Sequence, residues 1–75
     1  MNLLLKHKNI VIVGGSRGIG LSITKGFLEE GALVHVISRN KLEFSNEHLF
    51  HYKADATDFK QLFLAYDEIS KKIDN

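Results

Sequence analysis

The stretch NIVIVGGSRGIGLSITKGF, residues 9–27, runs from β-branched residues into a glycine cluster and then into spaced apolar residues. The continuous apolar run Ile10–Val13 predicts a strand that is covered on both faces of its sheet. Apolar residues then recur at every fourth position, at Ile19, Ile23 and Phe27. This spacing predicts a helix that begins at Ile19 and ends at Glu30. A strand that enters a helix through glycines indicates the α/β class.

Two more strands and one more helix are expected further along the chain. Gly31 follows the first helix where a left-handed C-terminal cap would lie. Leu33–Ile37 predicts a second strand, which is apolar except for one histidine. Leu49–Ala54 alternates, and its single polar face predicts a strand at the edge of the sheet. The segment between these two strands has room for at most a turn or two of helix.

The C-terminal segment has the pattern of a long amphipathic helix that ends near Ile73. Its apolar stripe, which we expect to be core surface, consists of Phe59, Leu62, Phe63, Tyr66, Ile69 and Ile73. Thr57 or Asp58 is the expected N-cap, and Asp58 with Gln61 has the spacing of a capping box.

Strands that alternate with helices predict right-handed crossovers and a parallel sheet, most simply in the order 3-2-1. We therefore expect residues 1–75 to form a single domain with a partial three-layer α/β fold, a short parallel sheet and flanking helices. A fourth strand would be needed to cover the far side of the first strand, and we expect the domain to be truncated before it. The unpaired edge of the first strand then predicts possible self-association.

Composition excludes several classes of function. Ten basic and nine acidic residues give a net charge of +1, which favours neither nucleic acid nor an anionic membrane as partner. The absence of cysteine excludes disulfides and thiolate metal sites. His48 and His51 are three positions apart, but no carboxylate or cysteine completes a set, so no metal site is expected. No apolar stretch reaches transmembrane or signal-peptide length, and a soluble, cytoplasmic chain is expected.

The glycine cluster predicts a phosphate-binding turn. Glycines between a strand and a helix present unhindered N–H groups at the positive end of the helix, where a side chain would block a pyrophosphate or close packing. The cluster lacks the Gly-Lys-Ser/Thr ending of a nucleoside-triphosphate loop and does not fit G-x-G-x-x-G. It fits G-x-x-x-G-x-G, with Gly14, Gly18 and Gly20.

With this spacing, VGGSRGIG resembles the cofactor loop of the short-chain dehydrogenase/reductase family. EEGALVHVISRN and ADATD resemble that family's second and third strands, in order and at suitable spacing. The resemblance implies a Rossmann-like fold that binds a nicotinamide dinucleotide and an oxidoreductase that transfers hydride to or from a carbonyl or alcohol carbon. The cofactor-binding residues that it implies are Gly14, Ser16, Arg17, Gly18, Ile19, Gly20, Ser38, Arg39 and Asp55. Asp55 would flank the adenine, although a plain turn residue would look the same.

Charge then predicts which cofactor is bound. An acidic side chain about 20 residues after the glycines usually holds a free ribose, whereas arginine suits a 2′-phosphate. Ser38 stands at the acidic position, Arg39 follows it, and Arg17 adds a second guanidinium. Two arginines and a serine hydroxyl favour NADP(H) over NAD. The alternative is that both arginines are solvated surface charges.

The family's Ser-Tyr-Lys catalytic set is not found in the chain. Tyr52 and Tyr66 are followed four positions later by Ala56 and Ser70 instead of lysine, so no catalytic residue is assigned. We expect the NADP(H)-binding N-terminal portion of such an oxidoreductase, inactive on its own. A stand-alone NADP(H)-binding or sensing module and a vestigial domain remain open. A methyltransferase loop is disfavoured by Ser38 and Arg39. His35 is expected to be a satisfied core histidine or to pack against adenosine.

Overall fold

The computed structural model describes residues 6–14 and 17–73 of the chain. The elements, in chain order, are β1 (Asn9–Val13), α1 (Gly18–Glu29), β2 (Leu33–Ser38), β3 (Leu49–Lys53) and α2 (Phe59–Ile73). Each lies within about one residue of the boundaries that the sequence predicts, which is the usual uncertainty at element ends.

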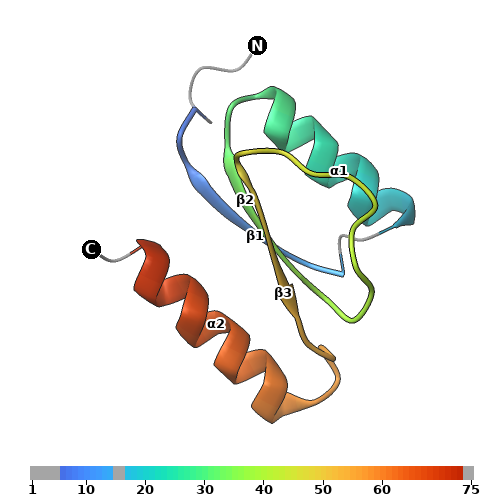
Figure 1. Ribbon diagram of the computed structural model, residues 1–75, viewed down its shortest axis with the longest axis vertical. Coiled ribbons are helices and arrows are strands. Elements are labelled where there is room, and N and C mark those ends of the chain that lie inside the picture. Colours follow the sequence, from blue (N-terminus) through green and yellow to red (C-terminus); the bar gives the residue numbers. More distant parts are fainter. Residues whose placement is uncertain (1–5, 15–16, 74–75) are drawn as a thin grey trace.

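The three strands form one parallel sheet in the order β1-β2-β3. The predicted strand order is therefore confirmed, with β2 in the centre and β3 at an edge. Helices α1 and α2 lie on opposite sides of the sheet (Figure 1). The chain thus forms a partial three-layer α/β fold in which the C-terminal ends of all three strands point the same way.

Each face of the sheet has its own core. On the α1 side, Val34 and Val36 are fully buried and pack with Ala32 and Leu42. On the α2 side, a second cluster consists of Ile37, Tyr52, Ala54, Ala65 and Ile69. Because alternate residues of a strand point to opposite faces, β2 supplies both clusters and is the best-buried strand.

The prediction that the first strand is covered on both faces is wrong for this structure. Ile10 and Ile12 pack towards α1, but Val11 and Val13 are 37% and 46% exposed. They point to the α2 face of the sheet, where α2 packs over β2 and β3 and leaves β1 uncovered. The apolar run therefore predicts the strand correctly, but it does not predict which faces of the strand are buried.

The predicted core stripe of α2 is also corrected. Phe59 and Phe63 are 83% and 62% exposed, and Tyr66 and Ile73 are largely exposed as well. Leu62 and Ile69, which also belong to the predicted stripe, do pack into the core, together with Ala65.

The predicted helix ends are confirmed, although Oε1 of Gln61 accepts the Asp55 N–H instead of the Asp58 N–H that a capping box requires. Gly31 has φ of +85° directly after α1. Its N–H donates to the Leu28 carbonyl, and the Ala32 N–H donates to the Phe27 carbonyl, which is the Schellman arrangement. At the start of α2, Oδ1 of Asp58 accepts the N–H groups of Lys60 and Gln61. Asp58, rather than Thr57, is therefore the N-cap.

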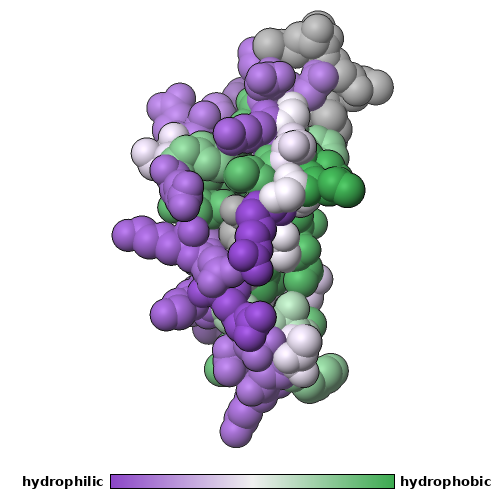
Figure 2. Space-filling model, turned by 90° about the vertical axis from the view of Figure 1, so that its right-hand side faces the viewer, coloured by the Kyte–Doolittle hydropathy of each residue, from purple (hydrophilic) through white to green (hydrophobic). Residues whose placement is uncertain are grey.

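Residues 39–48, all of which the structure describes, form no helix. This connection crosses the α1 face of the sheet, where Leu42 and Phe44 pack into the core. Seen from the side of α1, hydrophilic residues gather on one half of the surface and hydrophobic residues on the other (Figure 2). In the described part of the chain, no helix is long and apolar enough to cross a membrane.

Candidate functional site

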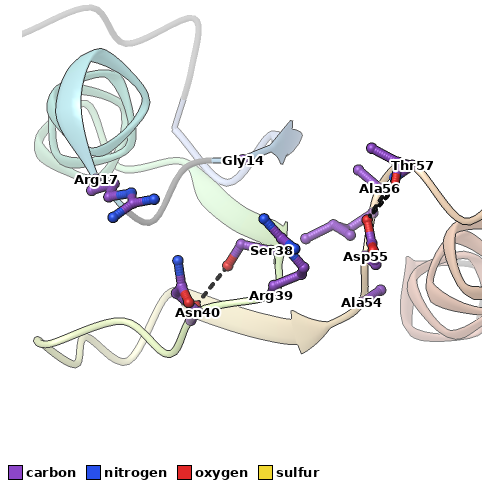
Figure 3. Close-up of a pocket in the computed structure, with 10 residues that line it drawn as sticks. Gly14, Arg17, Ser38, Arg39, Asn40, Ala54, Asp55, Ala56 and Thr57 are labelled. Atoms are coloured by element: carbon purple, nitrogen blue, oxygen red, sulfur yellow. Dashed lines mark hydrogen bonds between the residues drawn. The ribbon is translucent and has the colours of Figure 1, made fainter.

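The C-terminal ends of the three strands enclose a cavity of about 250 Å³. Two backbone hydrogen bonds hold these ends together: the Gly14 N–H donates to the Ile37 carbonyl at 2.7 Å, and the Ala54 N–H donates to the Ser38 carbonyl at 3.1 Å. The lining residues, most of them labelled in Figure 3, are Gly14, Arg17, Ile37, Ser38, Arg39, Asn40, Ala54, Asp55, Ala56 and Thr57. This end of a parallel sheet is where α/β proteins bind their ligands.

The glycines of the turn are required by backbone conformation. Gly14 has φ of +80° and Gly18 has φ of +62°, in the left-handed region that side chains disfavour. A Cβ built on either residue meets no heavy atom within 4 Å. Among the described residues, close packing of helix and strand does not exclude a side chain at either position, and the need for glycine that the structure shows is the positive φ.

The N-terminus of α1 adjoins this turn. Its N-cap, Arg17, makes no side-chain hydrogen bond to the helix end among the described residues, and the first turn carries no acidic side chain. The first N–H groups of a helix have no partner inside the helix. Ile19 stands beside them with 81% of its surface exposed. This end of α1 is thus suited to an anion or another acceptor.

Two guanidinium groups extend into the cavity from different elements. Arg17 comes from the start of α1 and Arg39 from the residue after β2 (Figure 3). With the carboxylate of Asp55, which also lines the cavity, the charged side chains of the lining carry two positive charges and one negative charge.

Ser38 is the last residue of β2 and only 6% exposed. Its hydroxyl donates to the Asn40 carbonyl at 2.8 Å and lies 2.9 Å from Nε2 of His51. The side chain therefore lines the cavity, but its single hydrogen is used within the protein. Towards a ligand, this side chain offers a small neutral surface without the repulsion of a carboxylate.

Asp55 lies across the cavity from the arginines and forms a tight turn. Its Oδ1 accepts the Thr57 hydroxyl at 2.6 Å and the Thr57 N–H at 2.9 Å. These two hydrogen bonds, with a smaller contribution from the positive charge of Arg39, lower the pKa of Asp55 below its ordinary value. Its own N–H donates to Oε1 of Gln61. Asp55 thus fixes the connection between β3 and α2 and remains an ionised carboxylate.

The structure brings five of the nine sequence-predicted site residues to the cavity: Gly14, Arg17, Ser38, Arg39 and Asp55. Gly18, Ile19 and Gly20 lie in the first turn of α1, outside the lining. Ser16 lies outside the described residues.

Sequence reasoning missed Asn40 and Thr57, which also line the cavity. The Asp-x-Thr spacing of residues 55–57 is a signal for the turn that Thr57 completes. His48 and His51 do not share a site. His51 contacts Ser38, and His48 lies beside Glu47. Over residues 6–14 and 17–73, no three acidic or histidine side chains gather into a metal-binding group.

The family model for the short chain dehydrogenases matches residues 8–75. The chain belongs to this family. Its members are oxidoreductases that bind a nicotinamide dinucleotide, and the resemblance inferred from the glycine spacing is confirmed. The 3-oxoacyl-[acyl-carrier-protein] reductase FabG of Chlamydia pneumoniae is 49% identical over 41 residues, which cover 55% of this chain and 16% of that enzyme.

Solved structures give the same fold. The ligand-free aldohexose dehydrogenase of Thermoplasma acidophilum matches 93% of this chain with a TM-score of 0.86 and 28% identity. This chain spans 27% of the length of that enzyme. Gluconobacter frateurii L-sorbose reductase, complexed with NADPH and L-sorbose, matches 95% of this chain and 31% of its own, with a TM-score of 0.78 and 23% identity. A Leptospira borgpetersenii short chain dehydrogenase with bound NAD+ matches 89% and 28%, with a TM-score of 0.74 and 24% identity. At this level of identity, the last two structures show the fold alone.

Proposed function

We propose that this chain binds NADP(H) as the N-terminal portion of a short chain dehydrogenase, with the 2′-phosphate of the cofactor between Arg17 and Arg39. The observation that carries the proposal is the pair of guanidinium groups lining one cavity with Ser38, where a carboxylate would hold a free ribose. The charge of these residues is complementary to that of the ligand, because two guanidinium groups match a dianionic phosphate.

The other parts of the cofactor follow from this placement. The pyrophosphate would lie on the turn of Gly14 and Gly18 at the N-terminus of α1, where Ser16, Ile19 and Gly20 belong to the same loop. Asp55 would flank the adenine from the β3 side of the cavity. When bound, the cofactor supplies the hydride of the family's reaction.

We propose that the chain alone binds the cofactor without transferring hydride. In its sequence, neither tyrosine has a lysine four positions later. Tyr52 is 6% exposed and is hydrogen-bonded to His35 in the core, and Tyr66 lies on α2 on the far side of the sheet from the glycine turn. Neither tyrosine lines the cavity, and the family's catalytic tyrosine therefore has no counterpart among the described residues of the site.

Calorimetric titration with adenosine 2′,5′-bisphosphate and adenosine 5′-monophosphate tests the cofactor preference, because the two ligands differ only in the 2′-phosphate. A charge-assisted hydrogen bond contributes about 1.5–3 kcal/mol, so even one such bond to the 2′-phosphate should make the bisphosphate bind at least roughly tenfold to a hundredfold more tightly. Arg39→Gln and Arg17→Gln should each reduce this ratio. Lys71→Gln, which removes an equal charge at the far end of α2, is the control. Equal affinities for the two nucleotides in the wild-type chain would overturn the proposal.

We further propose that the chain self-associates through the edge of β1 that pairs with no other described strand. Val11 and Val13 are exposed there, and a strand edge presents unpaired N–H and C=O groups. A second copy is the partner, since a net charge of +1 opposes association only weakly.

A further inference from the structure

A short chain of hydrogen bonds lies at the end of β2, on the wall of the candidate site. Nε2 of His51, on β3, is 2.9 Å from the Ser38 hydroxyl, and that hydroxyl is 2.8 Å from the Asn40 carbonyl. Ser38 is 6% exposed, and both hydrogen bonds are partly buried. Sequence reasoning assigned no role to His51 beyond a rejected metal ligand.

The direction of each bond follows from hydrogen count. A serine hydroxyl has one hydrogen, and here it is donated to the Asn40 carbonyl, which can only accept. The Ser38 oxygen must then accept from His51, so Nε2 of His51 carries a hydrogen. His51 thereby orients the hydroxyl towards Asn40.

This orientation holds the turn that carries Arg39. The Ser38 side chain closes over Arg39 onto Asn40, and the Ser38 carbonyl accepts the Ala54 N–H of the neighbouring segment. Arg39 is therefore fixed on both sides by bonds of Ser38, and its guanidinium projects into the cavity (Figure 3). Without the donor on His51, the hydroxyl could rotate and release the Asn40 carbonyl.

We propose that His51 is a positioning residue for nucleotide selectivity. It acts through Ser38 and Asn40 to hold Arg39 where a phosphate on the ribose 2′-oxygen would lie. The inference deepens the proposed function and rests on it. It also gives Ser38 a second use: besides avoiding the repulsion of a carboxylate, its hydroxyl fixes the turn instead of contacting the phosphate.

A purely structural role of His51 makes a different prediction. His51 also borders a second cavity, of about 200 Å³, with Leu42, Phe44 and Leu49. If it served only to pack there, its replacement would lower stability and would leave the ratio of the two nucleotide affinities unchanged.

The test measures that ratio, for adenosine 2′,5′-bisphosphate over adenosine 5′-monophosphate, in three variants of the chain. His51→Leu removes the donor, and His51→Gln restores a side-chain N–H group at similar reach. His48→Leu is the matched control, because the His48 ring lies against His7 and Glu47 instead of Ser38. We expect His51→Leu to reduce the ratio about threefold to tenfold, the worth of one hydrogen bond, with rescue by His51→Gln and no change in His48→Leu.

A double variant provides a second test, because the effects of two substitutions that act through one hydroxyl are not additive. Ser38→Ala should reduce the ratio as His51→Leu does, and the double variant should be no worse than Ser38→Ala, because both act through one hydroxyl. Additive losses would overturn the route through Ser38. A wild-type ratio near one would overturn the proposed function itself, whereas a high wild-type ratio that His51→Leu preserves would overturn only this inference.

A measurement on the wild-type chain covers the case in which the variants fail to fold. Nitrogen-15 NMR at alkaline pH, where histidine side chains are neutral, reports which ring nitrogen carries the hydrogen. We expect it on Nε2 of His51. A hydrogen on Nδ1 would leave Nε2 unable to donate and would overturn the inference.

Discussion

At the scale of single residues, His35 shows how a polar side chain can occupy the core of so small a sheet. It is 2% exposed, and its Nε2 lies 2.9 Å from Oδ1 of Asn9 on β1, while its Nδ1 lies 3.0 Å from the Tyr52 hydroxyl on β3. The Asn9 oxygen can only accept, so Nε2 donates and Nδ1 accepts from Tyr52. The neutral ring is therefore fully satisfied, and the predicted core histidine is confirmed.

This burial makes stability depend on pH. Desolvation, with a smaller contribution from the positive charge of Lys72, lowers the pKa of His35 from 6.5. As the pH falls below 6.5, the histidine becomes protonated in the unfolded chain while the native ring stays neutral. The free energy of unfolding should thus decrease with falling pH and level off below the native pKa. Urea unfolding from about pH 7 to about pH 5 measures this slope.

Two variants isolate the contribution of His35. His35→Gln should flatten the slope, because the variant has no ring to titrate. His48→Gln, at a half-exposed histidine, should leave it in place. An unchanged slope in His35→Gln would show that other groups cause the effect.

At the scale of elements, two glycines of the α1 region provide opposite tests of backbone conformation. Gly31 has φ of +85°, and a Cβ there would lie 3.4 Å from Cγ of Lys6. Gly26 lies inside α1, where a Cβ meets nothing within 4 Å. Gly31→Ala should therefore lower the free energy of unfolding by about 1–2 kcal/mol, and Gly26→Ala should raise it by about 0.5–1 kcal/mol. Urea unfolding of the pair decides, and shifts of the same sign would contradict the assignment of the helix end.

The elements themselves could be predicted from the sequence, but the burial of their faces could not. Periodicity and turn residues locate all five elements, because they depend on local spacing. Which stripe of α2 is buried depends instead on which strands the helix covers. It packs over β2 and β3, so Ala65 and Ile69 face the core while Phe63 stays 62% exposed.

Some residues of the candidate site could likewise be predicted from the sequence, and others could not. Gly14, Arg17 and Arg39 could be predicted because they sit at strand and helix ends, which a parallel sheet brings together. The partner of the Ser38 hydroxyl could not, because His51 is 13 positions away on another strand. Its contact with Ser38 depends on the register between β2 and β3, which places Val36 opposite His51.

At the scale of the whole molecule, several large apolar side chains are exposed. They include Val11 and Val13 on β1 and Phe63 and Tyr66 on α2. We expect sedimentation to show a species larger than the monomer in the wild-type chain. Val11→Lys should shift it towards the monomer, because a charge at the free edge opposes strand pairing.

Phe59→Lys distinguishes the edge of β1 from the surface of α2 as the contact. Phe59 is 83% exposed at the start of α2, and its replacement should leave the sedimentation unchanged if the strand edge is used. A monodisperse wild-type monomer would contradict the proposed self-association altogether.

The uneven burial of the three strands also divides the cavity into parts of different rigidity. From Val34 to Ser38, every residue of β2 is buried, whereas three of the five residues of β1 are exposed. Local opening begins where few apolar contacts oppose it, so β1 separates from the sheet more readily than β2. Gly14 follows the looser strand, and Arg39 follows the tighter one. A phosphate bound by both Arg17 and Arg39 would therefore link the end of β1 to the end of β2. Binding of the phosphate would then stabilise the folded chain against the separation of β1.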